Sequence, residues 1–436
     1  MRSTSFSLAR RSSLFFGLLL ILTLANCGIS QPAPVSTRIT SDPWQTITAP
    51  AGQRILAHAV SPVDPATLYI CAGDSAGAGQ VRLWRTRDGG THWSRLNVPD
   101  MAGSGCQIHI DSAQGQFLTV VVSGPNGGLT PCAGDTFLWS GNSGYNWQRI
   151  SHPDFGKLSP EYSYCDLQVA AAHLYLWISY GSPSRKVPQV SMLERSDDAG
   201  TSWTEIDASL GHEILFVPPR IALDGKTLAV SVLPVRQSGY AGTSVLWTSH
   251  DAGQTWQEQG PVPGRTLVLA PRIQPAHGST LAPFYNLAGE QLPEAMAALR
   301  VYQSSHGRGW SELPPLPVPG TSERQHGLLQ ALAVTDDGRL LAFGVDPKAG
   351  LSTLASGKNI QNTAPFWLWI WNPAITRWQV LSLPLTEPAS AGCGLCWGAS
   401  LSTGTDHKTY LTVASALEPN DPSSGFHLYR VRVPDA

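Results

Sequence analysis

Few residues of this chain are charged, and their distribution excludes several classes of function. Only 14% of the 436 residues are charged, and the formal net charge is −2. Lysine and arginine are scattered, so we expect no basic face that could hold a phosphate backbone. The 12 histidines show no zinc-binding spacing with glutamate or cysteine, and no Gly-x-Ser-x-Gly segment or phosphate-cradling loop occurs. The sequence therefore predicts no nucleic-acid partner, no metal and no cofactor.

Long apolar runs are equally scarce, and the one at residues 14–24 is too short to span a bilayer. Three arginines precede it, which is typical of an export signal. The segment Leu24-Ala25-Asn26-Cys27 then resembles the bacterial lipobox, which implies that Cys27 is diacylated and becomes the mature N-terminus. We expect a protein that faces outside the cytoplasm and is anchored to the membrane through Cys27. Simple secretion is the alternative.

The rest of the chain is predicted to form one monomeric domain behind a tether. After the signal at residues 1–27, residues 28–41 are rich in Ser, Thr and Pro and are expected to be flexible, and the domain covers 42–436. An even number of further cysteines in an oxidising compartment allows up to three disulfides among 15 pairings. The six are Cys71, Cys106, Cys132, Cys165, Cys393 and Cys396.

A short signature recurs every 53 to 56 residues: Ser or Thr, then Asp or a substitute, then Gly, then Trp. The three full copies pair Asp88 with Trp93, Asp198 with Trp203, and Asp251 with Trp256; a fourth has Asn142 before Trp147, and worn copies end at Trp310 and Trp378. A fixed period of this length, in a chain with 42 glycines and 34 prolines, indicates a radial or stacked array of small sheets.

One repeat contains four predicted strands, over residues 55–60, 68–72, 81–86 and 93–96. The Asp lies in the hairpin between the third and fourth strands, where its carboxylate can cap its own turn while Gly adopts the left-handed conformation. The Trp is expected to begin the fourth strand and to pack its ring into the sheet. We therefore predict structural roles for these Asp and Trp residues.

The ends of the chain are predicted to complete the last sheet. Three strands are expected near 395–402, 409–413 and 426–433, and Trp44-Gln45-Thr46-Ile47 is the candidate for the missing fourth. Pairing of these segments would leave no open sheet edge. The sequence thus predicts an all-β fold, a single β-propeller of four-stranded antiparallel blades. Seven blades are favoured, and six are the alternative.

The repeated segments resemble the Asp-box, or BNR repeat, of sialidases, sortilin-type receptors, photosystem assembly factors and some xyloglucan hydrolases. The resemblance covers residues 40–433. It implies a propeller, and the same architecture hosts unrelated functions. The leading hypothesis is a non-enzymatic propeller that binds a protein or glycan at its channel mouth and loops. An assembly factor that docks another exported protein is a related hypothesis.

The alternative from another class is an exo-α-sialidase-like glycoside hydrolase that acts on an anionic sugar. The resemblance to sialidases then implies three arginines around the sugar carboxylate, a Tyr–Glu pair and an acidic acid/base residue. No catalytic set stands out in the sequence. The candidates for holding an anionic ligand are Arg54, Arg220, Arg272 and Arg324.

Overall fold

A computed structural model describes most of the chain between residues 45 and 433. It covers 45–51, 53–74, 79–99, 101–103, 105–111, 115–123, 136–152, 163–180, 190–210, 214–215, 219–221, 225–233, 244–262, 275–276, 280–281, 284–288, 300–304, 309–314, 316–317, 328–335, 339–345, 366–372, 376–383, 399–403, 408–418 and 421–433. In these segments no helix has the length and apolar character needed to cross a membrane. The predicted signal, Cys27 and the tether lie outside the described residues.

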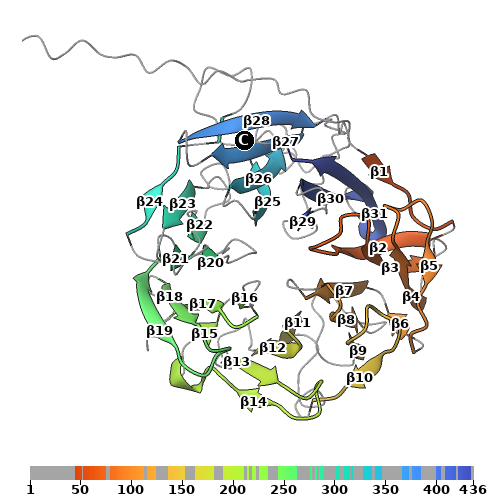
Figure 1. Ribbon diagram of the computed structural model, residues 1–436, viewed down its shortest axis with the longest axis horizontal. Helices are drawn as coiled ribbons and strands as arrows, with labels where there is room; N and C mark the ends of the chain where they lie inside the picture. The colour runs from red at the N-terminus through yellow and green to blue at the C-terminus, as the bar shows by residue number, and fades with distance from the viewer. Residues whose placement is uncertain are drawn as a thin grey trace, which may run out of the picture. The chain divides into compact units, whose positions relative to one another are not determined.

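The fold is a β-propeller of antiparallel sheets, and the first sheets follow one another along the chain (Figure 1). The first contains β2 (Gln53–Val60), β3 (Leu68–Asp74), β4 (Gly79–Thr86), β5 (Ser94–Arg95) and the short β6 (Met101–Gly103). The second contains β7 (Gly105–Ile110), β8 (Leu118–Ser123), β9 (Thr136–Ser140) and β10 (Gln148–Ile150). The third contains β11 (Ser163–Ala170), β12 (His173–Tyr180), β13 (Val190–Ser196) and β14 (Thr204–Glu205), followed by the 3-10 turn η2 (Ala208–Leu210).

The later sheets repeat this arrangement. The fourth contains β15 (Ile214–Leu215), β16 (Arg220–Ile221), β17 (Leu228–Leu233), β18 (Val245–Ser249) and β19 (Gln257–Pro261). Two smaller sheets follow, formed by β20 (Pro275–Ala276) with β21 (Thr280–Leu281), and by β22 (Phe284–Ala288), β23 (Arg300–Ser304) and β24 (Ser311–Glu312). The next contains β25 (Leu328–Val334), β26 (Leu340–Val345), β27 (Phe366–Asn372) and β28 (Arg377–Leu383).

The two ends of the domain build one sheet together, as predicted. Strands β29 (Ala399–Thr403), β30 (Thr409–Glu418) and β31 (Asp421–Arg432) come from the C-terminal region, and β1 (Gln45–Ile47) pairs antiparallel with β31. Arg430 on β31 donates one hydrogen bond to the Gln45 side chain, at 2.6 Å, and another to the Pro65 carbonyl of the first sheet. The contact between Gln45 and Arg430 joins residues 385 positions apart. Strand β31 also pairs with β2, at Phe426 and Ile55, so the strands of the chain ends and of the first sheet form one nine-stranded sheet. Trp44 itself lies outside the described residues.

The hydrophobic core lies between successive sheets, so each central sheet is buried on both faces. One cluster joins Tyr69 and Leu83 of the first sheet to Leu118 and Leu138 of the second. Equivalent clusters join the second sheet to the third and the third to the fourth. Burial on two faces explains why strands such as β8 (LTVVVS) are almost continuously apolar instead of alternating.

First strands of neighbouring sheets contact one another where β2 meets β7, β7 meets β11, and β29 meets β25 and β2. Figure 1 places these inner strands, namely β2, β7, β11, β16, β25 and β29, nearest the common centre of the sheets. The signature hairpins lie at the opposite, outer edge, before β5, β10, β14 and β19. The number of blades remains a prediction, because much of 263–299 lies outside the described residues.

The signature Trp residues differ from the prediction in one respect. We expected each to begin the fourth strand, but β5, β10, β14 and β19 each begin one residue after it. The reason is that the hydrogen bonds of the turn reach the residue just before the Trp, whose N–H is bound by the Asp or Asn side chain.

A disulfide joins Cys71 on β3 to Cys106 on β7, which links the first sheet to the second. Cys165 on β11 is also disulfide-bonded. The predicted use of the cysteines in disulfides is therefore confirmed for these three. Cys132, Cys393 and Cys396 lie outside the described residues.

We predict that Cys71→Ala/Cys106→Ala lowers the free energy of unfolding by about 4 kcal/mol. The disulfide spans 35 residues, and a cross-link over a loop of that length restricts the unfolded chain by about this amount. Urea unfolding of the oxidised wild type and of the double variant measures the difference. A change below about 1 kcal/mol would show that the cross-link does not contribute in this way.

Candidate functional site

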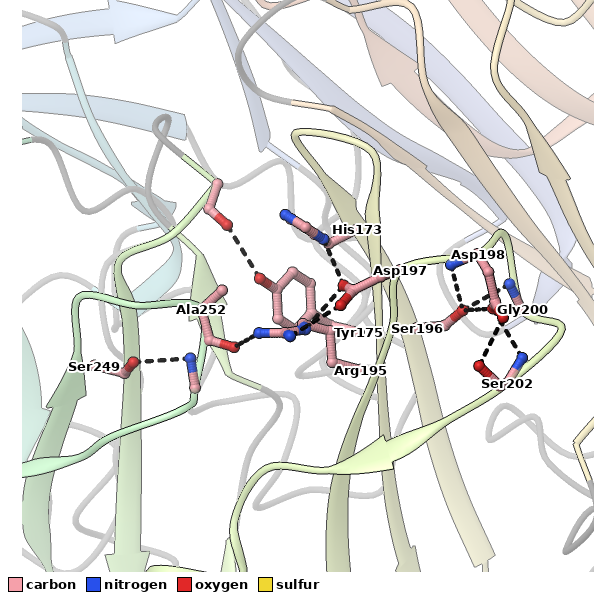
Figure 2. Close-up of polar contacts among 12 residues, drawn as sticks. His173, Tyr175, Arg195, Ser196, Asp197, Asp198, Gly200, Ser202, Ser249 and Ala252 are labelled. Carbon is pink, nitrogen blue, oxygen red and sulfur yellow. Dashed lines mark hydrogen bonds and ion pairs between the residues drawn. The ribbon is translucent and has the colours of Figure 1, made fainter.

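The signature turn has one hydrogen-bonding pattern in four copies, and the third copy shows it most clearly (Figure 2). Ser196 Oγ donates to Asp198 Oδ1 at 2.9 Å and accepts the Gly200 N–H at 2.8 Å. Asp198 Oδ1 also accepts the Ser202 N–H, at 2.8 Å. The same bonds centre on Asp88, Asn142 and Asp251 in the other three copies.

The backbone of the turn explains why Gly is needed. In the fourth copy, Ala252 and Gly253 both have positive φ, 59° and 87°. A Cβ atom at Gly253 would lie 2.4 Å from Ile206 Cδ1 of the third sheet. A glycine therefore allows both the left-handed conformation and the close approach of two neighbouring sheets.

The turn also fixes the charge of its carboxylates. The side-chain and backbone hydrogen bonds from Ser202 lower the pKa of Asp198 to about 2. The pKa of Asp88 is lowered further, by the backbone and then the ring of His92. These carboxylates are ionised and occupied by donors of their own turn, so they are poorly placed to act as acids or bases on a bound molecule.

Three of the signature Trp residues connect their sheet to the one before it. Trp256 Nε1 donates to the Ile206 carbonyl at 2.6 Å, and Trp93 Nε1 donates to the Thr48 carbonyl at 2.9 Å. Both carbonyls come directly after the outer strand of the neighbouring sheet. Trp378 Nε1 donates in the same way to Pro314, at 2.7 Å. Trp147 instead bonds within its own turn, to Gly144 at 3.0 Å.

Arginine side chains form a second set of contacts between sheets. Arg195 Nη1 on β13 donates to the Ala252 carbonyl in the next turn at 2.7 Å (Figure 2). Nη2 of the same guanidinium donates to Asp197 Oδ2 at 2.9 Å, and Nε lies 2.9 Å from Asp197 Oδ1 in an ion pair. Arg85 on β4 likewise donates to the Ser143 carbonyl at 2.8 Å. The signature turn is thus both the cap of one hairpin and the acceptor for its neighbour.

A polar cluster bridges the inner strands, and we take it as the candidate functional site. His109 Nε2 on β7 lies 2.8 Å from Asp166 Oδ1 on β11. Gln168 Nε2, also on β11, donates to Asp166 Oδ2 and to the Pro219 carbonyl, the latter at 3.2 Å. The side chains of His109 and Asp166 are 34% and 11% exposed, so the cluster is partly open to solvent. It reaches from the second sheet to the residue before β16 of the fourth.

The chemistry of this cluster is that of hydrogen bonding. An imidazole, a carboxylate and an amide are held in fixed positions at the inner edge of rigid strands. Among the described residues, no three His, Cys, Asp or Glu side chains gather as metal ligands would. These three side chains can therefore bind and orient the polar groups of a ligand through hydrogen bonds.

The predicted anion-binding arginines are only partly placed. Arg54 lies on β2 and Arg220 on β16, so both are on inner strands, although only their backbones are described. Arg272 and Arg324 lie outside the described residues, and the convergence of the four is untested. The sequence analysis missed His109, Asp166 and Gln168. Polar residues on the predicted first strands were the one sequence feature that could have indicated this cluster. No spacing reveals that His109 and Asp166, 57 positions apart, are in contact.

A second polar group lies between the second and third sheets. His152 Nε2 is 2.5 Å from Glu194 Oε2 on β13, and the His152 ring meets Trp203 edge-on at 5.5 Å. Asp207, after β14, is only 7% exposed and accepts the Leu193 N–H at 3.0 Å. Burial, with a further contribution from the charges of Glu205 and Glu194, raises the pKa of Asp207 to about 7. This group is enclosed, which favours a structural role.

Comparison with known proteins gives similarity in structure only. No protein-family model matches the sequence, and neither does any curated protein. YCF48 from Cyanidioschyzon merolae is similar at 13% identity with a TM-score of 0.45, covering 89% of this chain and 98% of that one. YCF48 bound to a D1 peptide is similar at 12% identity with a TM-score of 0.46, covering 91% of this chain and 99% of that one. A GH74 xyloglucanase from Xanthomonas campestris is similar at 16% identity with a TM-score of 0.40, covering 86% of this chain and 59% of the enzyme.

We predict that Asp207 makes the protein less stable as the pH rises from about 4 to about 7. A carboxyl whose folded-state pKa is raised contributes most below its unfolded pKa, and that contribution is lost as the pH approaches the folded value. With the pKa at about 7, the loss is on the order of 4 kcal/mol. Asp207→Asn should remove this decline in urea unfolding at pH 4 to 8.

The matched control is Asp198→Asn, because the pKa of Asp198 is shifted the other way. Its contribution is present above the unfolded pKa and is lost as the pH falls through about 2. The control variant should therefore keep the decline between pH 4 and 7. An Asp207→Asn protein with the wild-type pH profile would contradict the assignment.

Proposed function

We propose that the protein is an exported, membrane-tethered β-propeller that binds a protein or glycan ligand and leaves it chemically unchanged. The observation that carries this proposal is the cluster of His109, Asp166 and Gln168 on β7 and β11. It gathers polar side chains at the inner edge of the sheets, where the strands of three sheets come together. In a propeller, that edge is the natural place for a ligand to meet several sheets at once.

The scaffold around this cluster supports binding. Strands β7 and β11 pair over their full lengths with β8 and β12, and their apolar side chains belong to cores shared with neighbouring sheets. Side chains fixed in this way lose little conformational entropy when a ligand binds. The hydrogen bonds from Gln168 further restrict the orientation of Asp166.

The Asp residues of the Asp-box turns favour binding over turnover. Each is held by donors of its own turn, so the repeat does not supply a free carboxylic acid. The sialidase-type alternative depends on the convergence of Arg54, Arg220, Arg272 and Arg324, and it stays the second candidate. We therefore retain the binding function as the conclusion.

The proposed location rests on the sequence signal and on the disulfides. The Cys71–Cys106 bond is the kind of cross-link that persists in an oxidising compartment. It is consistent with export directed by residues 1–27 and with lipid attachment at Cys27. A membrane-anchored propeller would hold its ligand close to the cell surface.

We expect His109→Gln to reduce ligand affinity at least tenfold, because it removes the imidazole that lies 2.8 Å from the Asp166 carboxylate. Binding of the full-length protein to a glycan array and a displayed-peptide library identifies ligands, and titration then compares the variants. His92→Ala is the matched control, since the His92 side chain is 85% exposed on an outer turn. Equal affinity of His109→Gln and wild type for every ligand so identified would contradict the site. Turnover of fluorogenic sialosides that Arg54→Ala abolishes would support the enzyme instead.

The proposed tether is tested by Cys27→Ser. If Cys27 carries the lipid, this variant should move from the membrane fraction to the soluble extracytoplasmic fraction, because a signal sequence alone leaves no anchor. Fractionation followed by mass spectrometry of the N-terminus measures both the location and the lipid. The Cys71→Ala/Cys106→Ala variant controls for the replacement of cysteines elsewhere and should remain with the membrane. A soluble wild-type protein without lipid would exclude the tether.

A further inference from the structure

The outer edge of the second sheet contains a hollow with a volume of about 420 Å³. It lies at the signature turn between β9 and β10 and is lined by Trp139, Gly141, Asn142, Asn146, Trp147 and Gln148. The lining thus consists of two indole rings, three side-chain amides and a glycine, and it contains no charged side chain. The volume is within the range of sites that hold small molecules.

The turn that forms this hollow differs from the other copies at its amide residues. In the other three turns, the second carboxylate oxygen accepts a bond from the side chain four residues later, at 2.6 to 2.7 Å. The equivalent pair in the second turn is Asn142 and Asn146, and among the described residues no bond joins these two side chains. Asn142 Oδ1 still performs the turn function, accepting the Asn146 N–H at 2.8 Å. The amide nitrogen of Asn142 and the whole amide of Asn146 therefore remain available at the hollow.

The same turn also differs at the two positions that form the wall. The first and third copies have arginines, Arg85 and Arg195, where the second has Trp139. Two residues later they have Arg87 and Asp197, where the second has Gly141. Arg85 and Arg195 each donate to a backbone carbonyl of the next turn. In the second sheet, Gln148 Nε2 makes the corresponding contact, with the Ala199 carbonyl at 3.4 Å.

Gly141 is required by the position of the Trp139 ring. A Cβ atom at Gly141 would lie 2.8 Å from Trp139 Cη2, so the indole rests directly over the glycine. Phe117 stacks on Trp139 with a centroid distance of 6.5 Å and an interplanar angle of 17°, which fixes the ring. The departures of the second copy from the repeat, at Trp139, Gly141, Asn142 and Asn146, thus all line one hollow.

We propose that this hollow is a binding site for a neutral saccharide. The C–H groups of a sugar ring carry a partial positive charge and pack on the negative face of an indole, as Trp139 offers. Sugar hydroxyls both donate and accept hydrogen bonds, which matches the amides of Asn142, Asn146 and Gln148. An anionic ligand would meet no cation in the lining, and an apolar ligand would leave the amides unpaired. The site is separate from the inner-strand cluster and goes beyond the proposed function.

The test uses an exchange of turn residues between two copies. Asn142→Asp/Asn146→Ser gives the second turn the residues that the third turn has at Asp198 and Ser202. That pair is compatible with a folded hairpin, and its side chains bond to each other, so the two amides that face the hollow are removed. The probes are neutral glucose hexasaccharides with β-1,3, β-1,4 or α-1,4 linkages and chitotetraose, with oligogalacturonate as the anionic comparator. Titration of the full-length protein in detergent, followed by calorimetry and tryptophan fluorescence, measures the affinity.

We expect saturable binding of at least one neutral probe and at least a tenfold loss of affinity in the exchange variant, with the thermal midpoint retained. The matched control, Asp198→Asn/Ser202→Asn, makes the reverse change in the third turn and should bind as wild type does. Gly141→Arg introduces the residue that the first copy has at the equivalent position, Arg87, and it should also abolish binding. Absence of saturable binding to all neutral probes, a preference for oligogalacturonate, or unchanged affinity in the exchange variant would overturn the proposal.

The outcome is distinguishable from that of the proposed function. His109→Gln changes the inner edge of the sheets and should leave saccharide affinity at the outer hollow unchanged. If His109→Gln abolished saccharide binding while the exchange variant retained it, the saccharide would belong to the inner cluster and the outer site would be excluded.

Discussion

The structure depends on the contact between neighbouring sheets, which buries both faces of each central sheet. Apolar clusters supply most of this contact, and hydrogen bonds to backbone carbonyls set the alignment. Trp256 reaches back to Ile206 of the third sheet, and Arg195 reaches forward to Ala252 of the fourth. The acceptor of each bond is a backbone carbonyl. The alignment of neighbouring sheets therefore depends on the backbone shape of the accepting segment more than on its side chains.

This construction separates two regions with different freedom to vary. At the outer edge, the turn needs an acceptor that caps its own backbone, and Asn142 performs that function as well as Asp198 does. One copy of the turn can therefore change without loss of the fold. At the inner edge, strands from different sheets approach one another, so residues such as His109 and Asp166 can meet although they are distant in sequence. We place the two proposed binding sites at these two edges.

Much of the fold could be predicted because its signals are local. The signature spans eight residues, and the bonds that cap the turn, such as that from Ser202 to Asp198, lie within it. The period of the repeat then indicated a propeller, and the short segment at Gln45–Ile47 was identified as the strand that completes the last sheet. The candidate site was not predicted, because His109 and Asp166 have no distinctive sequence context.

The sequence alone determined the order of the strands, the chemistry of the turns and the pairing of the two chain ends. Each follows from residue types within a few positions of one another or from the regular spacing of the repeats. Only the tertiary structure decided that Cys71 pairs with Cys106, that Gln168 bridges Asp166 and the Pro219 carbonyl, and that the unusual residues of the second turn surround one hollow. These contacts depend on how neighbouring sheets stack and twist, which no short segment of sequence specifies.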